Sequence, residues 1–171
     1  MTRTVTGLFN DRDSAERAYT RALDAGYRAE EIDVVMSEET RERYYGKDAT
    51  LVTEVGNKSA QGAAIGGALG ASVGAIAAAI VATGTVLTLP GLGLVVAGPL
   101  AAAVAGAGAG GVSAGLVGAL VGWAIPEDRL KEYEAGVNSG GILIGVRSRS
   151  DEDSQRFVRD WNENQGQHIY P

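Results

Sequence analysis

The chain has 171 residues, no cysteine, and a formal net charge of −6 at pH 7 from 21 acidic and 15 basic residues. The absence of cysteine excludes a disulfide framework and thiolate chemistry. The acidic balance argues against a nucleic-acid partner, which requires a positive field. The length fits one domain that carries an insertion.

The first arm of the chain has the order strand, helix, strand. Thr4–Phe9 has strand-like composition, and Asp13-Ser-Ala-Glu16 is typical of a helix start with an acceptor at the cap. Gly26 ends the helical pattern, and Ile32–Met36 is the second predicted strand. The polar stretch that follows is predicted to be a loop with one helical turn at Glu38–Tyr45. The first helix has an apolar face that consists of Ala15, Ala18, Tyr19, Ala22 and Leu23.

The middle of the chain, residues 59–126, carries no charge. It contains no Asp, Glu, Lys, Arg or His, and glycine and alanine fill 36 of its 68 positions. On a helix, small residues at every fourth position line one side, where another backbone packs closely. We therefore predict a hairpin of two glycine-zipper helices, Ala60–Thr83 and Leu100–Ala124, joined by an apolar connection over 84–98. The predicted packing positions are Gly62, Gly66, Gly70 and Gly74, then Gly106, Gly110, Ala114, Gly118 and Gly122.

Each predicted helix is long enough to span a bilayer, because it would measure about 36 Å against a hydrocarbon core of about 30 Å. Trp123 lies near the end of the second helix, where an interfacial aromatic residue is expected. The basic residues Lys58, Arg129 and Lys131 flank the hairpin and would place both termini in the cytoplasm. This interpretation predicts a membrane-associated protein with lipid as a partner.

Two features of the same segment favour a different environment. Its predicted helices are rich in glycine and alanine rather than leucine and phenylalanine, so their tendency to insert is small. The connection is itself apolar, so we expect it to be buried, either as a re-entrant tip in a bilayer or inside an oligomer. The sequence leaves open a membrane-inserted hairpin, a cytoplasmic soluble homo-oligomer with a Gly/Ala core, and a disordered or aggregating tract.

The second arm repeats the strand, helix, strand order. Gly141–Val146 is the predicted strand, and Ser150 with three following acids opens a helix. Phe157 and Trp161 are four residues apart on the apolar face of that helix. His168–Tyr170 is the predicted last strand.

Residues 1–58 and 127–171 therefore look like two halves of one α+β domain. Two β-α-β units predict a ferredoxin-like, split βαβ sheet of four antiparallel strands with two helices on one face. The hairpin is inserted between the halves. A short helix that begins at Pro126, with Leu130 and Tyr133 facing inward, follows the hairpin.

Motifs that suggest chemistry have simpler explanations. The run Gly106–Gly111 matches G-x-G-x-x-G, but the four-residue repeat already accounts for its glycines, and the dinucleotide fingerprint requires a βαβ unit around it. His168 is the only histidine, and without cysteine it cannot form a usual zinc site. No nucleophile, base and orienting group can be assembled. We expect no enzymatic activity, cofactor, metal or small-molecule substrate.

The first arm resembles the bacterial general-stress-protein family of the YflT (heat-induced stress protein) type. This resemblance covers about 35 residues and implies a stress-linked, non-enzymatic protein; the family supplies no catalytic residues. Members of this group often carry a glycine-rich apolar segment after the first βαβ unit, as this chain does. The matching residues are Gly7-Leu-Phe9, Ala15-Glu16, Ala18, Leu23, Ala25-Gly26-Tyr27 and Ile32-Asp-Val-Val35.

We therefore expect a non-enzymatic, stress-associated protein that self-assembles through its glycine-zipper helices and is inserted in or attached to a membrane. The first alternative is a soluble homo-oligomeric ring or shell with the hairpins as its inner core. The second is a sensory module that binds a small ligand, because ferredoxin-like sheets accommodate many ligands.

Overall fold

The structure is a computed structural model that describes residues 3–45, 74–83, 86–89, 93–107, 120 and 125–171. Its fold class is α+β, as predicted. Several residues singled out in the sequence lie outside the described residues, namely Lys58, Gly62, Gly66, Gly70, Gly110, Ala114, Gly118, Gly122 and Trp123.

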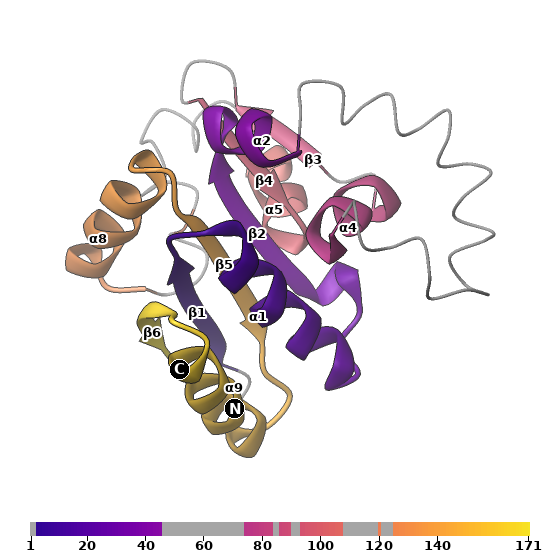
Figure 1. Cartoon of the computed structure of the whole chain (residues 1–171), viewed down its shortest axis with the longest axis vertical. Helices are drawn as coiled ribbons and strands as arrows, with labels where there is room; N and C mark the ends of the chain where they lie inside the picture. The colour runs from indigo at the N-terminus through magenta and orange to yellow at the C-terminus, as the bar shows by residue number, and fades with distance from the viewer. Residues whose placement is uncertain (1–2, 46–73, 84–85, 90–92, 108–119, 121–124) are drawn as a thin grey trace.

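The centre of the molecule is a six-stranded sheet in the order β3-β4-β2-β5-β1-β6 (Figure 1). Every neighbouring pair of strands is antiparallel. Strand β5 lies between β1 and β2, so each arm of the chain contributes strands to the middle of the sheet. The strands are β1 Thr4–Phe9, β2 Ile32–Ser37, β3 Val86–Leu89, β4 Leu94–Ala97, β5 Ile142–Arg147 and β6 Gln167–Tyr170.

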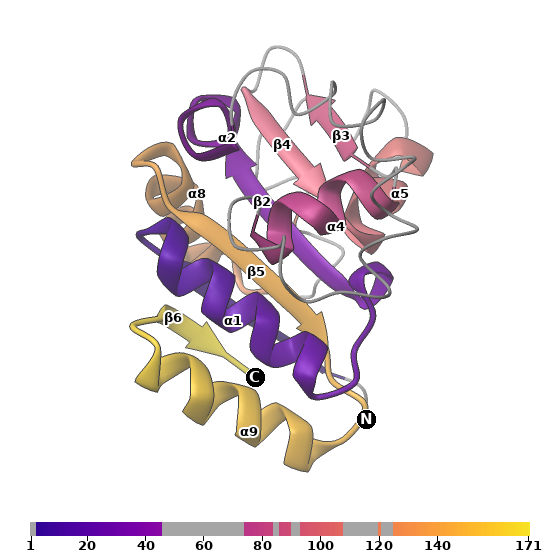
Figure 2. The same cartoon turned by 45° about the vertical axis from the view of Figure 1, so that its right-hand side comes forward.

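The two predicted β-α-β units are confirmed as β1-α1-β2 and β5-α9-β6, with α1 at Arg12–Asp24 and α9 at Asp151–Glu163. Both helices cover the same face of the sheet (Figure 2). Their apolar side chains form one buried cluster with β1, β2 and β5. Helix α9 approaches β1 closely, because a Cβ atom on Gly7 would lie 2.9 Å from Cε3 of Trp161.

The helix starts follow ordinary capping chemistry, with one correction. Ser150 caps α9 by accepting the backbone N–H of Asp153, as the sequence indicates. The predicted cap of α1, Asp13, is wrong. Asp11 has the extended backbone of a cap residue and accepts the N–H of Ser14 at 2.8 Å, whereas Asp13 lies in the first turn.

The second face of the sheet is also covered, which differs from the prediction of helices on one face only. Helices α5, Pro99–Ala107, and α8, Glu127–Asn138, pack there. The physical reason is that β2 and β5 carry apolar side chains on both faces, so both faces exclude water. The second buried cluster consists of Leu8, Val35, Leu94, Val96, Leu100, Ala101, Val104, Leu120, Leu130, Tyr133, Val137 and Leu143.

The predicted structure of the insertion is wrong in its middle. The connection over 84–98 carries β3 and β4, and β4 pairs with β2 so that Val96 lies opposite Val35. Strand β4 is therefore buried in the chain's own sheet. Glycines with positive φ, Gly93 at +60° and Gly98 at +96°, bound β4 on both sides.

The first predicted helix of the hairpin is also different. Helix α4 occupies Ala75–Thr83, and Gly74 before it has a φ of +55°, so no helix runs unbroken from residue 60 to 83. Helix α4 lies on the α1 side of the sheet. In the part of the chain that the structure describes, every helix is too short or too polar to cross a bilayer. The turn predicted at Glu38–Tyr45 forms helix α2.

Candidate functional site

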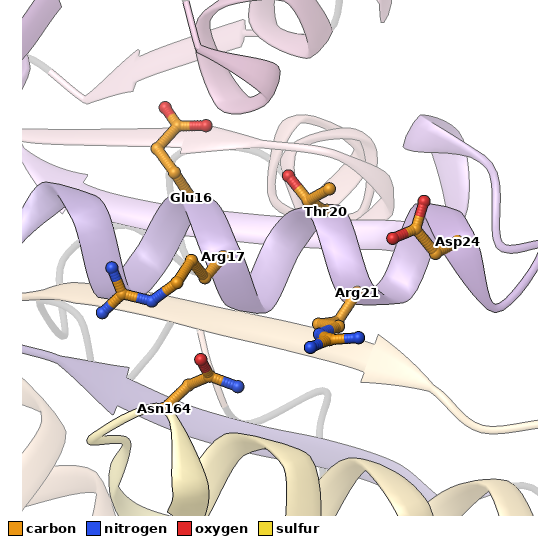
Figure 3. A pocket seen from close by; sticks show the side chains of 6 residues that line it. All are labelled: Glu16, Arg17, Thr20, Arg21, Asp24 and Asn164. Atoms are coloured by element: carbon orange, nitrogen blue, oxygen red, sulfur yellow. The ribbon is translucent and has the colours of Figure 1, made fainter.

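The first hollow on the surface lies along α1. It measures 350 Å³. Arg17 and Arg21 lie on the side of α1 that faces Asn164, the residue directly after α9, whereas Glu16 points to the opposite side of α1 (Figure 3). Its lining is polar and carries both signs of charge. The residues that line it are Glu16, Arg17, Thr20, Arg21, Asp24 and Asn164.

A second hollow, of 410 Å³, lies between α8, β1 and β6. His168 Nδ1 lies 2.9 Å from the Glu132 carboxylate on its wall. The Tyr133 hydroxyl donates to the His168 backbone oxygen at 2.6 Å and hydrogen-bonds Thr6 Oγ1 at 2.8 Å. Ser139, which also lines the hollow, donates its hydroxyl to Ala135 O. These contacts attach β6 to α8. Among the described residues that line the hollow, none places a nucleophile beside the His168 imidazole.

The most unusual polar contacts lie where the uncharged insertion meets the arms. A helix leaves its first backbone N–H groups without partners inside the helix. The two residues before α5 and its first residue, Ala97-Gly98-Pro99, contain no side-chain acceptor, and Gly74 directly precedes α4. Both helices obtain their acceptor from a carboxylate in the first arm, one on each face of the sheet.

Asp33 of β2 caps α5. Its Oδ1 accepts the N–H of Leu100 at 2.6 Å, and the side chain is 5% exposed. Proline at position 99 needs no partner because it has no N–H. Gly98 passes so close that a Cβ there would lie 2.9 Å from Asp33 Oδ1 and nearer still to Ile32 O. A helix of the insertion is thus held on a carboxylate 67 residues earlier in the chain.

Burial raises the pKa of Asp33 to about 6, and the Leu100 N–H and the Arg147 charge oppose that rise. The cause is the loss of water around the charged form. Among the described residues, Asp33 forms no salt bridge. The carboxyl therefore changes its protonation state near physiological pH.

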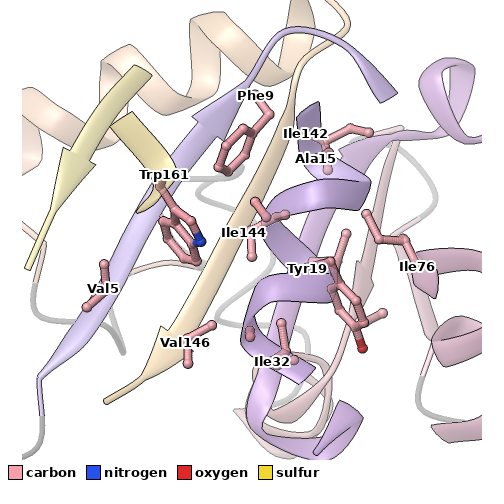
Figure 4. Packing of buried hydrophobic residues seen from close by; sticks show 14 of the residues in the cluster. Val5, Phe9, Ala15, Tyr19, Ile32, Ile76, Ile142, Ile144, Val146 and Trp161 are labelled. Atoms are coloured by element: carbon pink, nitrogen blue, oxygen red, sulfur yellow. The ribbon is translucent and has the colours of Figure 1, made fainter. Parts of the chain in front are cut away.

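Glu16 of α1 caps α4 in the same way but with more partners. Its Oε2 accepts the N–H of Ile76 at 3.0 Å, and Tyr45 donates its hydroxyl to Oε1 at 3.1 Å. Arg12 Nε lies 4.0 Å from that Oε1, and its guanidinium lies over the Tyr45 ring. Ile76 enters the core on the α1 side of the sheet (Figure 4). A Cβ on Gly74 would collide with the Glu16 carboxylate.

The described site residues from the sequence do not form one cluster. Gly74 precedes α4, and Gly106 lies in the last turn of α5. Arg129 lies over the Tyr170 ring, and Lys131 is exposed on α8. The sequence analysis did not assign Asp33 a role. Its signal was one acid inside the apolar strand Ile32–Ser37.

Comparison of the chain with protein-family models, with curated proteins and with solved structures finds no match.

Proposed function

We propose that this chain is a non-enzymatic protein that self-associates through its uncharged Gly/Ala-rich segment, with the sheet domain as a support. One observation carries the proposal: residues 59–126 contain no charge over 68 positions, 36 of which are glycine or alanine. The described helices of this segment, α4 and α5, have no charged side chain on any face. Uncharged surfaces of this kind associate with a partner when they are exposed.

Glycine-zipper packing is the mode of association that the spacing supports. Each small residue adds a modest energy, so the effect accumulates along a run of such positions. The sequence spacing supports this packing: Gly62, Gly66 and Gly70 fall at four-residue intervals, and so do Gly106 and Gly110.

Four strands of the sheet support a related proposal about the fold of the two arms. The order β2-β5-β1-β6, with α1 and α9 on one face, is the arrangement expected of a ferredoxin-like, split βαβ domain. The insertion then adds β3 and β4 beyond β2. The resemblance of the first arm to general stress proteins suggests a role under stress, and the protein's abundance in its native cells after heat shock tests that suggestion.

The decisive experiment replaces zipper glycines by leucine. Gly66→Leu and Gly110→Leu are each expected to hold the helices apart and shift the protein to smaller particles in sedimentation velocity. Ala64→Leu and Ala109→Leu, which lie off the four-residue stripes, are the matched controls and should leave the size unchanged. A monodisperse monomer of the unmodified chain without detergent would falsify the proposal.

Membrane attachment is the second candidate, favoured by the length of the uncharged segment and by Trp123, Lys58, Arg129 and Lys131 around its end points. Flotation with lipid vesicles distinguishes it from a soluble ring or shell. Recovery at the top of the gradient supports attachment. A large particle that stays at the bottom and keeps its size in detergent supports the soluble assembly.

A further inference from the structure

The contact between α5 and β2 depends on one buried carboxyl group. We propose that Asp33 is a pH-operated latch for α5: the helix rests firmly on the sheet when this carboxyl is protonated and leaves the sheet more often as the pH rises to neutrality and above. The latch is a property of the folded sheet domain, beyond the self-association proposed above.

Few groups hold α5 on the sheet. Among the side chains of α5 whose burial the structure describes, three are buried against the sheet, Leu100, Ala101 and Val104. Two of its neighbouring positions, Ala102 and Ala103, are exposed. Its polar attachment is the 2.6 Å hydrogen bond from Leu100 N–H to Asp33, because the helix has no charged residue of its own. Gly98, directly before the helix, has a φ of +96°, which glycine adopts without steric cost.

Asp33 is the titrating group of the contact between α5 and β2, and other charged groups lie on the elements around it. Arg147 on β5 acts on it and favours the ionised form, while β4 and α5 carry no charge. The neighbouring 3-10 turn at Ala29–Glu31 contributes Glu30 and Glu31, which pair with Arg28, and Glu31 also pairs with Arg149. Helix α8 on the same face carries Glu127, Asp128, Arg129, Lys131, Glu132 and Glu134.

The sign of the effect follows from proton linkage. When α5 leaves, Asp33 meets water and returns toward the ordinary value of 3.8, whereas burial under the helix raises its pKa to about 6. The closed form therefore binds the proton more tightly, and closure is favoured as the pH falls. Between about pH 5 and about pH 7.5, these two values correspond to a rise of about tenfold in the opening equilibrium.

Opening would uncover apolar surface from two elements at once. Leu100, Ala101 and Val104 leave the sheet, and the sheet loses cover over Val35 and Val96. Any use of this surface in assembly rests on the proposed function, whereas the opening itself does not.

Amide hydrogen exchange on the full chain tests the latch. Protection factors of the Ala103 and Val104 amides, corrected for intrinsic exchange, should fall about tenfold from about pH 5 to about pH 7.5. Amides of α4, capped by Glu16, and of Ile144 in the central strand are the internal references and should change less. In Asp33→Asn, whose amide oxygen still accepts the Leu100 N–H, the α5 amides should be equally protected at both pH values.

Three outcomes overturn the latch: α5 protection that does not vary with pH, the same variation in D33N, or an equal fall at Ile144, which would mean global unfolding. If D33N does not fold, the comparison of α5 with Ile144 in the unmodified chain still decides. The readout is local exchange rather than particle size, so the latch and the glycine-zipper assembly can fail independently.

Discussion

Two helices of the arms, α1 and α9, and the helices α4 and α5 of the uncharged segment obtain their caps in different ways. Helices α1 and α9 lie on one face of the sheet, and each is capped by the residue directly before it, Asp11 or Ser150. Helices α4 and α5 take their caps from distant carboxylates instead, Glu16 of α1 and Asp33 of β2. The comparison predicts that packing dominates stability where α1 and α9 cover the sheet, and that protonation matters where α5 rests on β2.

The largest effect should come from the aromatic face. Trp161 is fully buried and contacts the Phe9 and Phe157 rings, each at 5.7 Å between centroids. Trp161→Ala should lower the free energy of unfolding by about 3–5 kcal/mol, since the cavity cannot collapse fully. Urea denaturation measures it. Trp161→Phe is the control and should lose much less, because the indole N–H has no hydrogen-bond partner among the described residues. Equal losses would contradict the packing explanation.

The next effect should come from the second face and should depend on pH. Asp33→Asn removes a buried charge but keeps an acceptor for Leu100 N–H. The raised pKa of about 6 means that the unmodified chain loses stability as pH rises from about 4 through 6, because the folded state binds the proton more tightly. The variant should therefore be more stable by roughly 3 kcal/mol above pH 7.

Below about pH 4 the two proteins should have the same stability, because both then carry a neutral group at this position. Thermal or urea unfolding across this range provides the measurement. A variant that is less stable than the unmodified chain at pH 7.5 would show that the charge itself holds α5.

A smaller effect is expected at the cap of α4. Glu16→Ala removes the acceptor of the Ile76 N–H and of the Tyr45 hydroxyl, so it should cost about 1 kcal/mol of stability. Glu16→Gln keeps an acceptor oxygen and should lose less. Faster hydrogen exchange at Ile80 would locate the effect in α4. No difference between the alanine and glutamine variants would show that the hydrogen bonds contribute little.

The smallest effect should come from an exposed ion pair of α2. Arg43 donates to Glu39 at 2.9 Å, but both side chains are more than half exposed. Arg43→Ala should change stability by about 0.3–0.5 kcal/mol at low salt and by less in high salt. Urea denaturation at two ionic strengths provides the measurement. A loss of stability as large as that of Glu16→Ala would contradict the expected order of effects.

The parts predicted well from the sequence are those whose signals are local. Phe157 and Trp161 mark an apolar helix face through their four-residue spacing, and Ser150 marks its start. Strand β4 was missed because Leu94–Ala97 was assigned to a loop, although a short apolar run between two glycines is also typical of a buried strand. The contact between Asp33 and Leu100 could not be predicted, because it depends on where β4 places α5 and not on any nearby pattern.

The position of β5 between β1 and β2 has a consequence for synthesis on the ribosome. Residues 142–147 are made after both strands of the first arm, and until they emerge those two strands have no common neighbour. Strand β2 can meet β4 earlier, since both have already left the exit tunnel. Until β5 emerges, the nascent chain therefore carries its apolar middle segment beside an incomplete sheet, and this is the interval when a chaperone would be of most use.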